Sequence, residues 1–396
     1  MKPEPMAIYE VLSDQTAKAA LDEMGGLEYL VLLKDSRVME DNIKIYCEKV
    51  KQAYVRRTLF DICESGKELM LSSSSEKLNP SELVSSIENK LGDLSIQMST
   101  TSEVYKMGEE TDEVLAAREA SPETIPGLEV GFTEMDKLTN GLMPGDLLVL
   151  AAESKTGKSA MLTNWATNLA ILGKVPVLYI DTEMNHREQE DRILSRLSQV
   201  PHNEVVSGMY VLDSAFGKAD DKIARIKAAR DKLKLGNYFH IQMTQFSIEK
   251  VTAIARKFQI QHGIQALFFD YIKVPSGDMS SLNKMQEYQA LGFFTSGLKD
   301  IASTLSIPVI TAAQTNRTNL GEVDKDASSI GGSYRILQLA TKLLFLVNKS
   351  DKQISESGID NGNQVLSIKY QRNGASDCDP INIMFYKNIL FQKEAH

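Results

Sequence analysis

The stretch Leu147–Ser159 reads L-L-V-L-A-A-E-S-K-T-G-K-S, and it decides the fold. Its first part, Leu147–Leu150, is a continuous apolar run that is typical of a strand buried on both faces of a parallel sheet. Gly157-Lys158-Ser159 then leads into a helical pattern of apolar positions: Met161, Leu162, Trp165, Ala166 and Leu169. A strand, this loop and a helix in succession predict a phosphate-binding loop over Ala152–Ser159.

The residue types in this loop suit a nucleoside triphosphate. Backbone N–H groups at a helix N-terminus bind phosphate oxygens. Lys158 is expected to neutralise charge on the β- and γ-phosphates, and Ser159 to ligate Mg²⁺. We therefore predict ATP, or another NTP, and Mg²⁺ as cofactors. The predicted nucleotide contacts in the loop are Ser154, Lys155, Thr156, Gly157, Lys158 and Ser159.

Acidic residues end two further apolar runs. Asp270 follows Leu267-Phe268-Phe269, a position that suits the second Mg²⁺-associated carboxylate of P-loop enzymes. Asp181 and Glu183 follow the run Val177–Ile180, and hydrolysis needs a base near the γ-phosphate. Spacing alone does not choose between these two acids.

Two polar residues complete the candidate set. Gln314 ends the run Val309–Ala313, where an amide could sense the γ-phosphate. Arg372 follows a late strand and could act on a neighbour's nucleotide as an arginine finger. It could equally be a surface arginine beside the turn Asn373-Gly374, and the bare sequence favours that second interpretation.

Composition limits the alternatives. The chain has 396 residues, 42% hydrophobic and 24% charged, with a net charge of -9. Two domains are expected for this length. Three scattered cysteines suggest a reducing compartment without a cysteine metal site. The chain lacks a membrane-length apolar run and a signal sequence, so we expect a cytoplasmic protein. The negative charge argues weakly against nucleic-acid binding.

The pattern along the chain changes twice. Residues 1–96 read as a helical N-terminal domain, and residues 97–127 as a linker with a short helix at Glu110–Ala120. Residues 128–396 alternate short apolar runs with helical patterns, which predicts an α/β fold with a mostly parallel sheet. The expected strands are Asp146–Ala152, Val175–Asp181, Tyr238–Met243, Ala266–Val274, Pro308–Gln314, Lys342–Val347, Val365–Tyr370, Ile381–Tyr386 and Ile389–Gln392.

Taken together, these motifs resemble the DnaB-type hexameric replicative helicases, whose motor is a RecA-like domain. Gly131-Phe132-Thr133-Glu134-Met135-Asp136 resembles the start of that family's motor. The family commonly has alanine at the position of Ala152. Thr182-Glu183-Met184 is similar to its catalytic segment, and Asp270-Tyr271 matches its Asp-Tyr. Gln314-Thr315-Asn316-Arg317 resembles its Gln-Leu-Asn-Arg, and Gln371-Arg372-Asn373-Gly374 is identical to its finger segment.

The resemblance implies residue roles that the pattern alone leaves open. It selects Glu183 over Asp181 as the catalytic base, and it makes Arg372 the arginine finger. Arg192 matches an arginine that packs near the nucleotide base. Lys369 lies one residue before the family's second finger lysine, where this chain has Tyr370. Catalytic roles are thus expected for Lys158, Glu183, Gln314 and Arg372, and nucleotide contacts also for Arg192 and Lys369.

The resemblance further implies a homo-oligomeric ring, expected to be a hexamer, that moves on single-stranded DNA and unwinds a forked duplex. The loops at residues 276–286 and 316–335 would face DNA, with contacts expected from Lys284, Arg317, Gly331, Gly332, Ser333 and Arg335. The linker helix would dock on a neighbour through Val114 and Leu115. A primase and a helicase loader are expected partners. The N-terminal part resembles only the later portion of the family's helical domain, a shortening that suggests a bacteriophage product in a bacterial cytoplasm.

Two other function classes compete with the helicase. A RecA-like protein could filament on DNA, load other proteins or act as a switch without unwinding, and a metabolic P-loop kinase would act as a monomer. Closed rings seen by electron microscopy favour the helicase, open filaments favour the RecA-like protein, and absence of DNA-stimulated ATPase favours the kinase.

Overall fold

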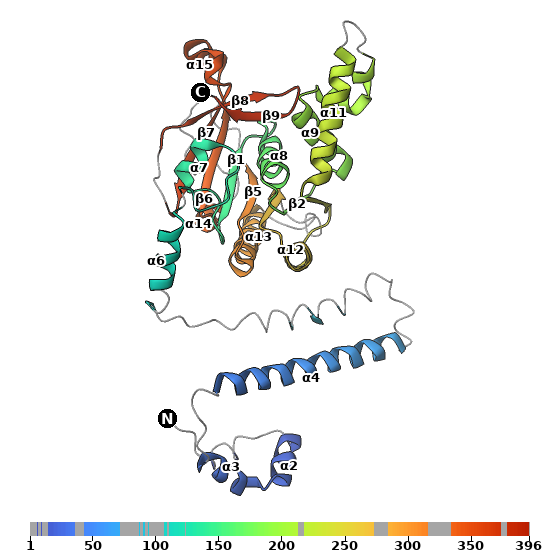
Figure 1. Cartoon of the computed structure of the whole chain (residues 1–396), viewed down its shortest axis with the longest axis vertical. Coiled ribbons are helices and arrows are strands. Elements are labelled where there is room, and N and C mark those ends of the chain that lie inside the picture. The colour runs from blue at the N-terminus through green and yellow to red at the C-terminus, as the bar shows by residue number, and fades with distance from the viewer. Residues whose placement is uncertain are drawn as a thin grey trace. The chain divides into compact units, whose positions relative to one another are not determined.

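The computed structural model describes residues 15–35, 43–71, 111–122, 124–212, 218–272, 284–315, 334–373 and 378–395, together with isolated positions before residue 109. The chain forms two compact units, residues 1–109 and 110–396 (Figure 1). The domain boundaries expected at residues 96 and 127 stay a prediction.

The first unit is helical wherever it is described. Its helices are α2 (Gln15–Glu23), α3 (Gly26–Asp35) and α4 (Ile43–Leu71). Leu21 and Ile62 are buried, and Gly66 of α4 lies against the side chain of Ile87. Residues 72–86, within the part predicted to be helical, fall outside the described residues.

The second unit is built on one sheet. In the described residues this sheet has the strand order β3-β2-β4-β5-β1-β6-β7-β8-β9. The strands from β3 to β6 in this order pair in parallel, and β7, β8 and β9 pair antiparallel. The strands are β1 (Leu147–Ala152), β2 (Val177–Asp181), β3 (Tyr238–Gln242), β4 (Ala266–Asp270), β5 (Val309–Gln314), β6 (Lys342–Asn348), β7 (Gln364–Gln371), β8 (Ile381–Tyr386) and β9 (Phe391–Glu394).

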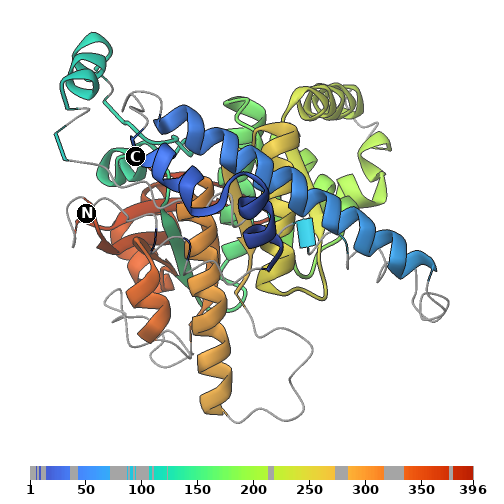
Figure 2. The same cartoon turned by 90° about the horizontal axis from the view of Figure 1, so that it is seen from below.

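Helices cover both faces of the sheet because side chains alternate along each strand. Leu148 and Leu150 of β1 pack in the layer that contains Trp165 of α8, whereas Leu147 and Val149 pack in the layer that contains Leu298 of α13. The long α13 is the orange helix in Figure 2. All six residues of β1 are buried, as the apolar run predicts.

The remaining elements connect the strands or stand beside the sheet. Helices α9, α10 and α11 are in contact and form the yellow-green projection in Figure 1. The elements are α6 (Thr111–Ala120), α7 (Thr133–Thr139), α8 (Lys158–Thr167), η3 (Asn168–Leu172), α9 (His186–Ser198), α10 (His202–Ser207), η4 (Met209–Val211), α11 (Lys218–Leu235), α12 (Ile248–His262), α13 (Lys284–Leu305), α14 (Tyr334–Leu339), α15 (Asp351–Ser357) and η7 (Ile359–Asn361).

Two carboxylates bind backbone N–H groups near the start of the second unit, and one of them comes from its last strand. Glu394 of β9 accepts N–H hydrogen bonds from Glu134 and Met135 at 3.0 Å, at the N-terminus of α7. Asp136 accepts bonds from the N–H groups of residues 130–132 at 2.9–3.1 Å. Burial raises the pKa of Asp136 to about 6, although these N–H groups lower it. Asp136 of the Gly-Phe-Thr-Glu-Met-Asp motif is therefore a structural residue.

The predicted α/β fold with a mostly parallel sheet is confirmed. Each expected strand is present within a few residues of its predicted bounds, apart from Lys273 and Val274, which lie outside the described residues. The antiparallel addition of β7 to β6 was not predicted. In the described part of the chain, no helix is long and apolar enough to cross a membrane.

A buried ion pair stabilises the edge where β1 and β6 begin. The Lys342 ammonium lies 2.7 Å from the Asp146 carboxylate, with side chains only 3% and 11% exposed. Asp146 also accepts a hydrogen bond from the Thr341 hydroxyl at 2.9 Å, and Lys342 donates to the carbonyl of Gly141. Because the pair is buried, loss of one partner would leave an uncompensated charge.

We expect Lys342→Met to lower the free energy of unfolding by about 3 kcal/mol, because Asp146 keeps its charge and loses its counterion. Urea unfolding followed by the fluorescence of Trp165, the one tryptophan of the chain, reports on this unit. Lys352→Met is the matched control, since its pair with Glu356 is 3.8 Å long and exposed. Equal unfolding midpoints for Lys342→Met and the wild type would contradict the prediction.

Candidate active site

The phosphate-binding loop joins β1 to α8 with a tightly constrained backbone. Lys155 has φ 66° and Gly157 has φ 107°. A Cβ added to Gly157 would lie 2.8 Å from Cε1 of Phe385 in β8. Position 157 therefore requires glycine both for its backbone angle and for space. The loop ends at the N-terminus of α8, whose N–H groups favour an anion.

Lys158 is the first residue of α8 and is only 9% exposed. Its ammonium donates hydrogen bonds to the carbonyl oxygens of Ala152 at 3.1 Å and Glu153 at 3.0 Å. Burial lowers the pKa of Lys158, and the carboxylates of Asp270, Glu183 and Glu153 act in the opposite direction. The predicted catalytic lysine and both predicted acids thus share one electrostatic environment.

Asp270 lies at the carboxyl end of β4, where its backbone pairs with Asp181 of β2. Its Oδ2 accepts a hydrogen bond from the Tyr179 hydroxyl at 3.1 Å. Burial raises the pKa of Asp270 to about 6, and repulsion from Asp181 adds to the rise, whereas the hydroxyls of Ser159 and Tyr179 and the charge of Arg192 lower the pKa. A cation beside this buried carboxylate would favour its ionised form.

The arrangement fits Mg²⁺. Within the described residues, Oδ1 of Asp270 is buried and has no hydrogen-bond partner, and the Ser159 hydroxyl lies nearby. The same part of the chain holds no cluster of three or more His, Cys, Asp or Glu side chains that could enclose a metal. Mg²⁺ commonly binds through one or two protein groups plus phosphate and water oxygens, so a sparse protein site is appropriate for this ion.

The structure gives Asp181 and Glu183 different environments. Asp181 is 1% exposed, and its Oδ1 accepts the backbone N–H groups of Glu183 at 2.8 Å and Met184 at 2.7 Å. Glu183 is exposed. Asp181 therefore holds the turn that presents Glu183, and the choice of Glu183 as base is consistent with this geometry.

Tyr271 is a residue that the sequence reasoning did not assign to the site. Its hydroxyl donates a hydrogen bond to Oε1 of Glu183 at 3.0 Å. Burial and this bond raise the pKa of Tyr271 to about 12, so the phenol remains a donor at neutral pH. Tyr271 is part of the motif Asp270-Tyr271 that the sequence shows. Only the fold shows that its hydroxyl contacts the carboxylate of Glu183.

Arg192 and Gln314 lie on elements that reach the same edge of the sheet. Arg192 is a half-buried residue of α9, and its charge lowers the pKa values of Asp181 and Asp270. Gln314 ends β5 opposite Ala152 of β1 and is exposed. The N–H of the next residue, Thr315, donates to the Ala152 carbonyl at 3.1 Å. Both residues therefore lie beside the phosphate-binding loop.

Arg372 lies at the opposite edge. β7 runs antiparallel to β6, so Gln364 pairs with Asn348 near the loop and Gln371 pairs with Lys342 at the far end. The N–H of Arg372 donates to the Thr341 carbonyl at 2.8 Å, and its side chain is exposed. Burial lowers the pKa of Lys299, and the Arg372 charge lowers it further, which places the two cations close together.

Lys369 lies near Arg372 at the far end of β7, away from the phosphate-binding loop of the same subunit. Leu343 of β6 pairs with Tyr370 and the next residue, Leu344, pairs with Ile368, so Lys369 is the extra residue of a β-bulge. Of the predicted DNA contacts, Arg317, Gly331, Gly332 and Ser333 lie outside the described residues. Lys284 and Arg335 lie in α13 and α14.

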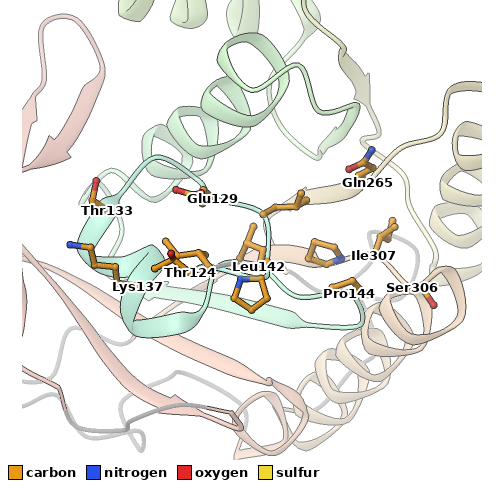
Figure 3. Close-up of a pocket in the computed structure, with 14 residues that line it drawn as sticks. Thr124, Glu129, Thr133, Lys137, Leu142, Pro144, Gln265, Ser306 and Ile307 are labelled. Carbon is orange, nitrogen blue, oxygen red and sulfur yellow. The ribbon is translucent and has the colours of Figure 1, made fainter. Parts of the chain in front are cut away.

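A cavity of about 810 Å³ lies away from this chemistry, at the edge where the strands begin (Figure 3). Pro144, Gln265 and Ile307 line it just before β1, β4 and β5, and Leu142 contributes to its apolar wall. The candidate catalytic side chains lie at the carboxyl ends of the strands, whereas this cavity lies at the opposite edge of the sheet.

Comparison with known proteins shows the family of the chain. The DnaB-like helicase C-terminal domain matches residues 127–393. The chain belongs to this family. It is 24% identical over 357 residues to the replicative DNA helicase DnaB of Treponema pallidum (strain Nichols), covering 90% of this chain and 76% of that protein. The corresponding helicase of Haemophilus influenzae is 25% identical over 368 residues, with the same coverage of both chains.

Solved structures of DnaB-like proteins have the same fold. A DnaB-like replicative helicase, whose structure was determined together with its interactions with primase, has a TM-score of 0.70 at 18% identity. The match covers 98% of this chain and 90% of that one. A solved ATPase domain has a TM-score of 0.64 and 18% identity, covering 74% of this chain and all of that domain. The family predicted from the sequence is thus confirmed.

We expect Asp270→Asn to stabilise the nucleotide-free protein by about 2 kcal/mol at pH 7.5. Because the folded-state pKa is raised to about 6, the folded protein holds the Asp270 proton between about pH 4 and 6 while the unfolded chain releases it. Ionisation therefore lowers stability as the pH rises through that window. The variant's advantage should be full above pH 6 and vanish near pH 4. Urea unfolding at a series of pH values measures it, and an advantage that grows on acidification would contradict this assignment.

Proposed function

We infer that this protein is an ATP-dependent replicative DNA helicase, in which each nucleotide site is shared by two subunits. The position of Arg372 is the observation that supports a site shared between subunits. β6 has seven residues, so at about 3.3 Å per residue it spans roughly 20 Å between the two edges of the sheet. That distance exceeds the reach of an arginine side chain. Arg372 therefore acts on the nucleotide of a neighbouring copy.

Within one subunit, the loop binds and orients ATP. The N–H groups of the loop and of α8 would contact phosphate oxygens, and Lys158 would leave its two carbonyl partners to approach the γ-phosphate. Ser159 and Asp270 would hold Mg²⁺. The bound ion would supply the positive charge that neutralises the β- and γ-phosphates and favours the ionised form of Asp270.

Glu183 is positioned to orient the attacking water. It is exposed on a turn fixed by Asp181, and its carboxylate lies near Lys158 and Asp270. The Tyr271 hydroxyl donates a hydrogen bond to Oε1 of this carboxylate and so orients it. Gln314, at the end of the neighbouring strand, is the group that we assign to the γ-phosphate as a sensor. Arg192 would contribute to nucleotide binding from α9.

Assembly and partners follow from the same proposal. Shared sites repeated head to tail form a closed ring, which we propose to be a hexamer. The exposed Val114 and Leu115 of α6, and the apolar cavity at the amino edge of the sheet, are the surfaces that we propose for contact between neighbours. Single-stranded DNA would be gripped in the pore through its backbone, independently of sequence. Primase and a loader are the partners proposed for the assembled ring.

The proposed function is tested by strand displacement on a forked duplex with ATP and Mg²⁺. Wild type should release the displaced strand, and Lys158→Ala should lower both hydrolysis and unwinding by at least about a hundredfold, because the γ-phosphate loses its neutralising cation. Lys352→Ala, an exposed lysine of α15, is the matched control.

Hydrolysis by the wild type without displacement on any fork would contradict the helicase function. Open filaments on single-stranded DNA in electron micrographs would then point to the RecA-like alternative.

A further inference from the structure

A chain of buried glutamine side chains stands behind the phosphate-binding loop. Gln364, the first residue of β7, is 1% exposed. Its Nε2 donates to the carbonyl oxygen of Thr156 at 2.6 Å and to Oδ1 of Asn348 at 2.8 Å. Its Oε1 accepts a hydrogen bond from Nε2 of Gln392, in β9, at 2.8 Å. The bond to Thr156 is therefore part of a buried network and is shielded from water.

The bond to Thr156 sets the direction of the next N–H group. The Thr156–Gly157 peptide is trans, so its carbonyl and its N–H point in opposite directions. With the carbonyl oxygen of Thr156 held by Gln364, the N–H of Gly157 is directed to the other side of the peptide, away from Gln364. An N–H group at this place, next to the N-terminus of α8, suits a phosphate oxygen.

This peptide is the one in the loop that most needs an external support. Gly157 lacks a Cβ, so its φ can change sign at little cost, and rotation of the Thr156–Gly157 peptide would turn the N–H away from the phosphate. Phe385 fills the space beside Gly157 and fixes the position of its Cα. It offers no hydrogen bond that would fix the orientation of the peptide. Gln364 supplies that bond.

We propose that Gln364 is a positioning residue for ATP binding, which acts by holding the Thr156–Gly157 peptide in its phosphate-binding orientation. This inference rests on the proposed nucleotide site and adds to it a side chain that contacts no nucleotide itself. The carbonyl left without its partner would be buried and unsatisfied, which favours rotation of the peptide.

The test is the affinity of the full-length protein for a fluorescent ADP analogue in the presence of Mg²⁺. Gln364→Met keeps the length of the side chain and removes both donors. We expect it to raise Kd at least tenfold, and to raise the KM for ATP more than it lowers kcat. The matched control is Gln371→Met, at the other end of β7, where the Gln371 amide also donates to a backbone carbonyl, that of Leu138, at 3.0 Å. That control should change Kd less than twofold. It should lower the melting temperature by about as much as Gln364→Met does.

The outcomes separate this inference from the proposed function. If Lys158→Ala weakens binding and a folded Gln364→Met does not, the role of Gln364 is wrong and the nucleotide site stands. If Lys158→Ala binds as the wild type does, the nucleotide site itself is wrong. Should Gln364→Met fail to fold, Gln364→Asn keeps a buried amide but is one methylene too short to reach Thr156, and unchanged binding by that variant overturns the inference.

Discussion

Parallel pairing of β1, β2, β4 and β5 is the constraint on which the site depends, because it forces the carboxyl ends of these strands to one edge of the sheet. Ala152, Asp181, Asp270 and Gln314 end those four strands, and the phosphate-binding loop begins at the first of them. β7 runs in the opposite direction and carries Arg372 to the other edge. One strand thus contacts the phosphate-binding loop through Gln364 and leads to Arg372 at the other edge. Under the proposed function, the reversal of this single strand would make each subunit half of two sites.

Burial disfavours the charged form of three groups at the carboxyl edge of the sheet. It lowers the pKa of Lys158 and raises the pKa values of Asp181 and Asp270. The opposite edge differs, because Asp146 and Lys342 are paired directly. At the proposed nucleotide site, phosphates would pair with Lys158 and Mg²⁺ with Asp270, which would reduce the cost of burying these charges. The sheet and its two helical layers, with Trp165 fully buried, hold these groups in place meanwhile.

The sequence predicts the parts of this arrangement that depend on local pattern. Continuous apolar runs such as Leu147–Leu150 identified the strands, and a polar residue after each run identified the candidate site, because strand ends meet at one edge. Contacts between distant segments could not be predicted in this way. Tyr271 bonding to Glu183, Glu394 binding the start of α7 and Gln364 holding Thr156 all join residues that are 88 or more positions apart. The bulge at Lys369 depends on the pairing of β7 with β6, so it could not be predicted from local pattern.

The central claim, that Arg372 completes the site of a neighbouring subunit, is tested most directly by mixing two inactive variants. Lys158→Ala subunits have a finger without a working loop, and Arg372→Ala subunits have a loop without a finger. In an equal mixture about a quarter of head-to-tail interfaces would combine the intact loop with the intact finger. We predict that DNA-stimulated ATP hydrolysis, absent from either variant alone, returns in the mixture and is greatest near equal proportions. Absence of hydrolysis at every ratio, in rings shown by native mass spectrometry to contain both variants, would contradict the account.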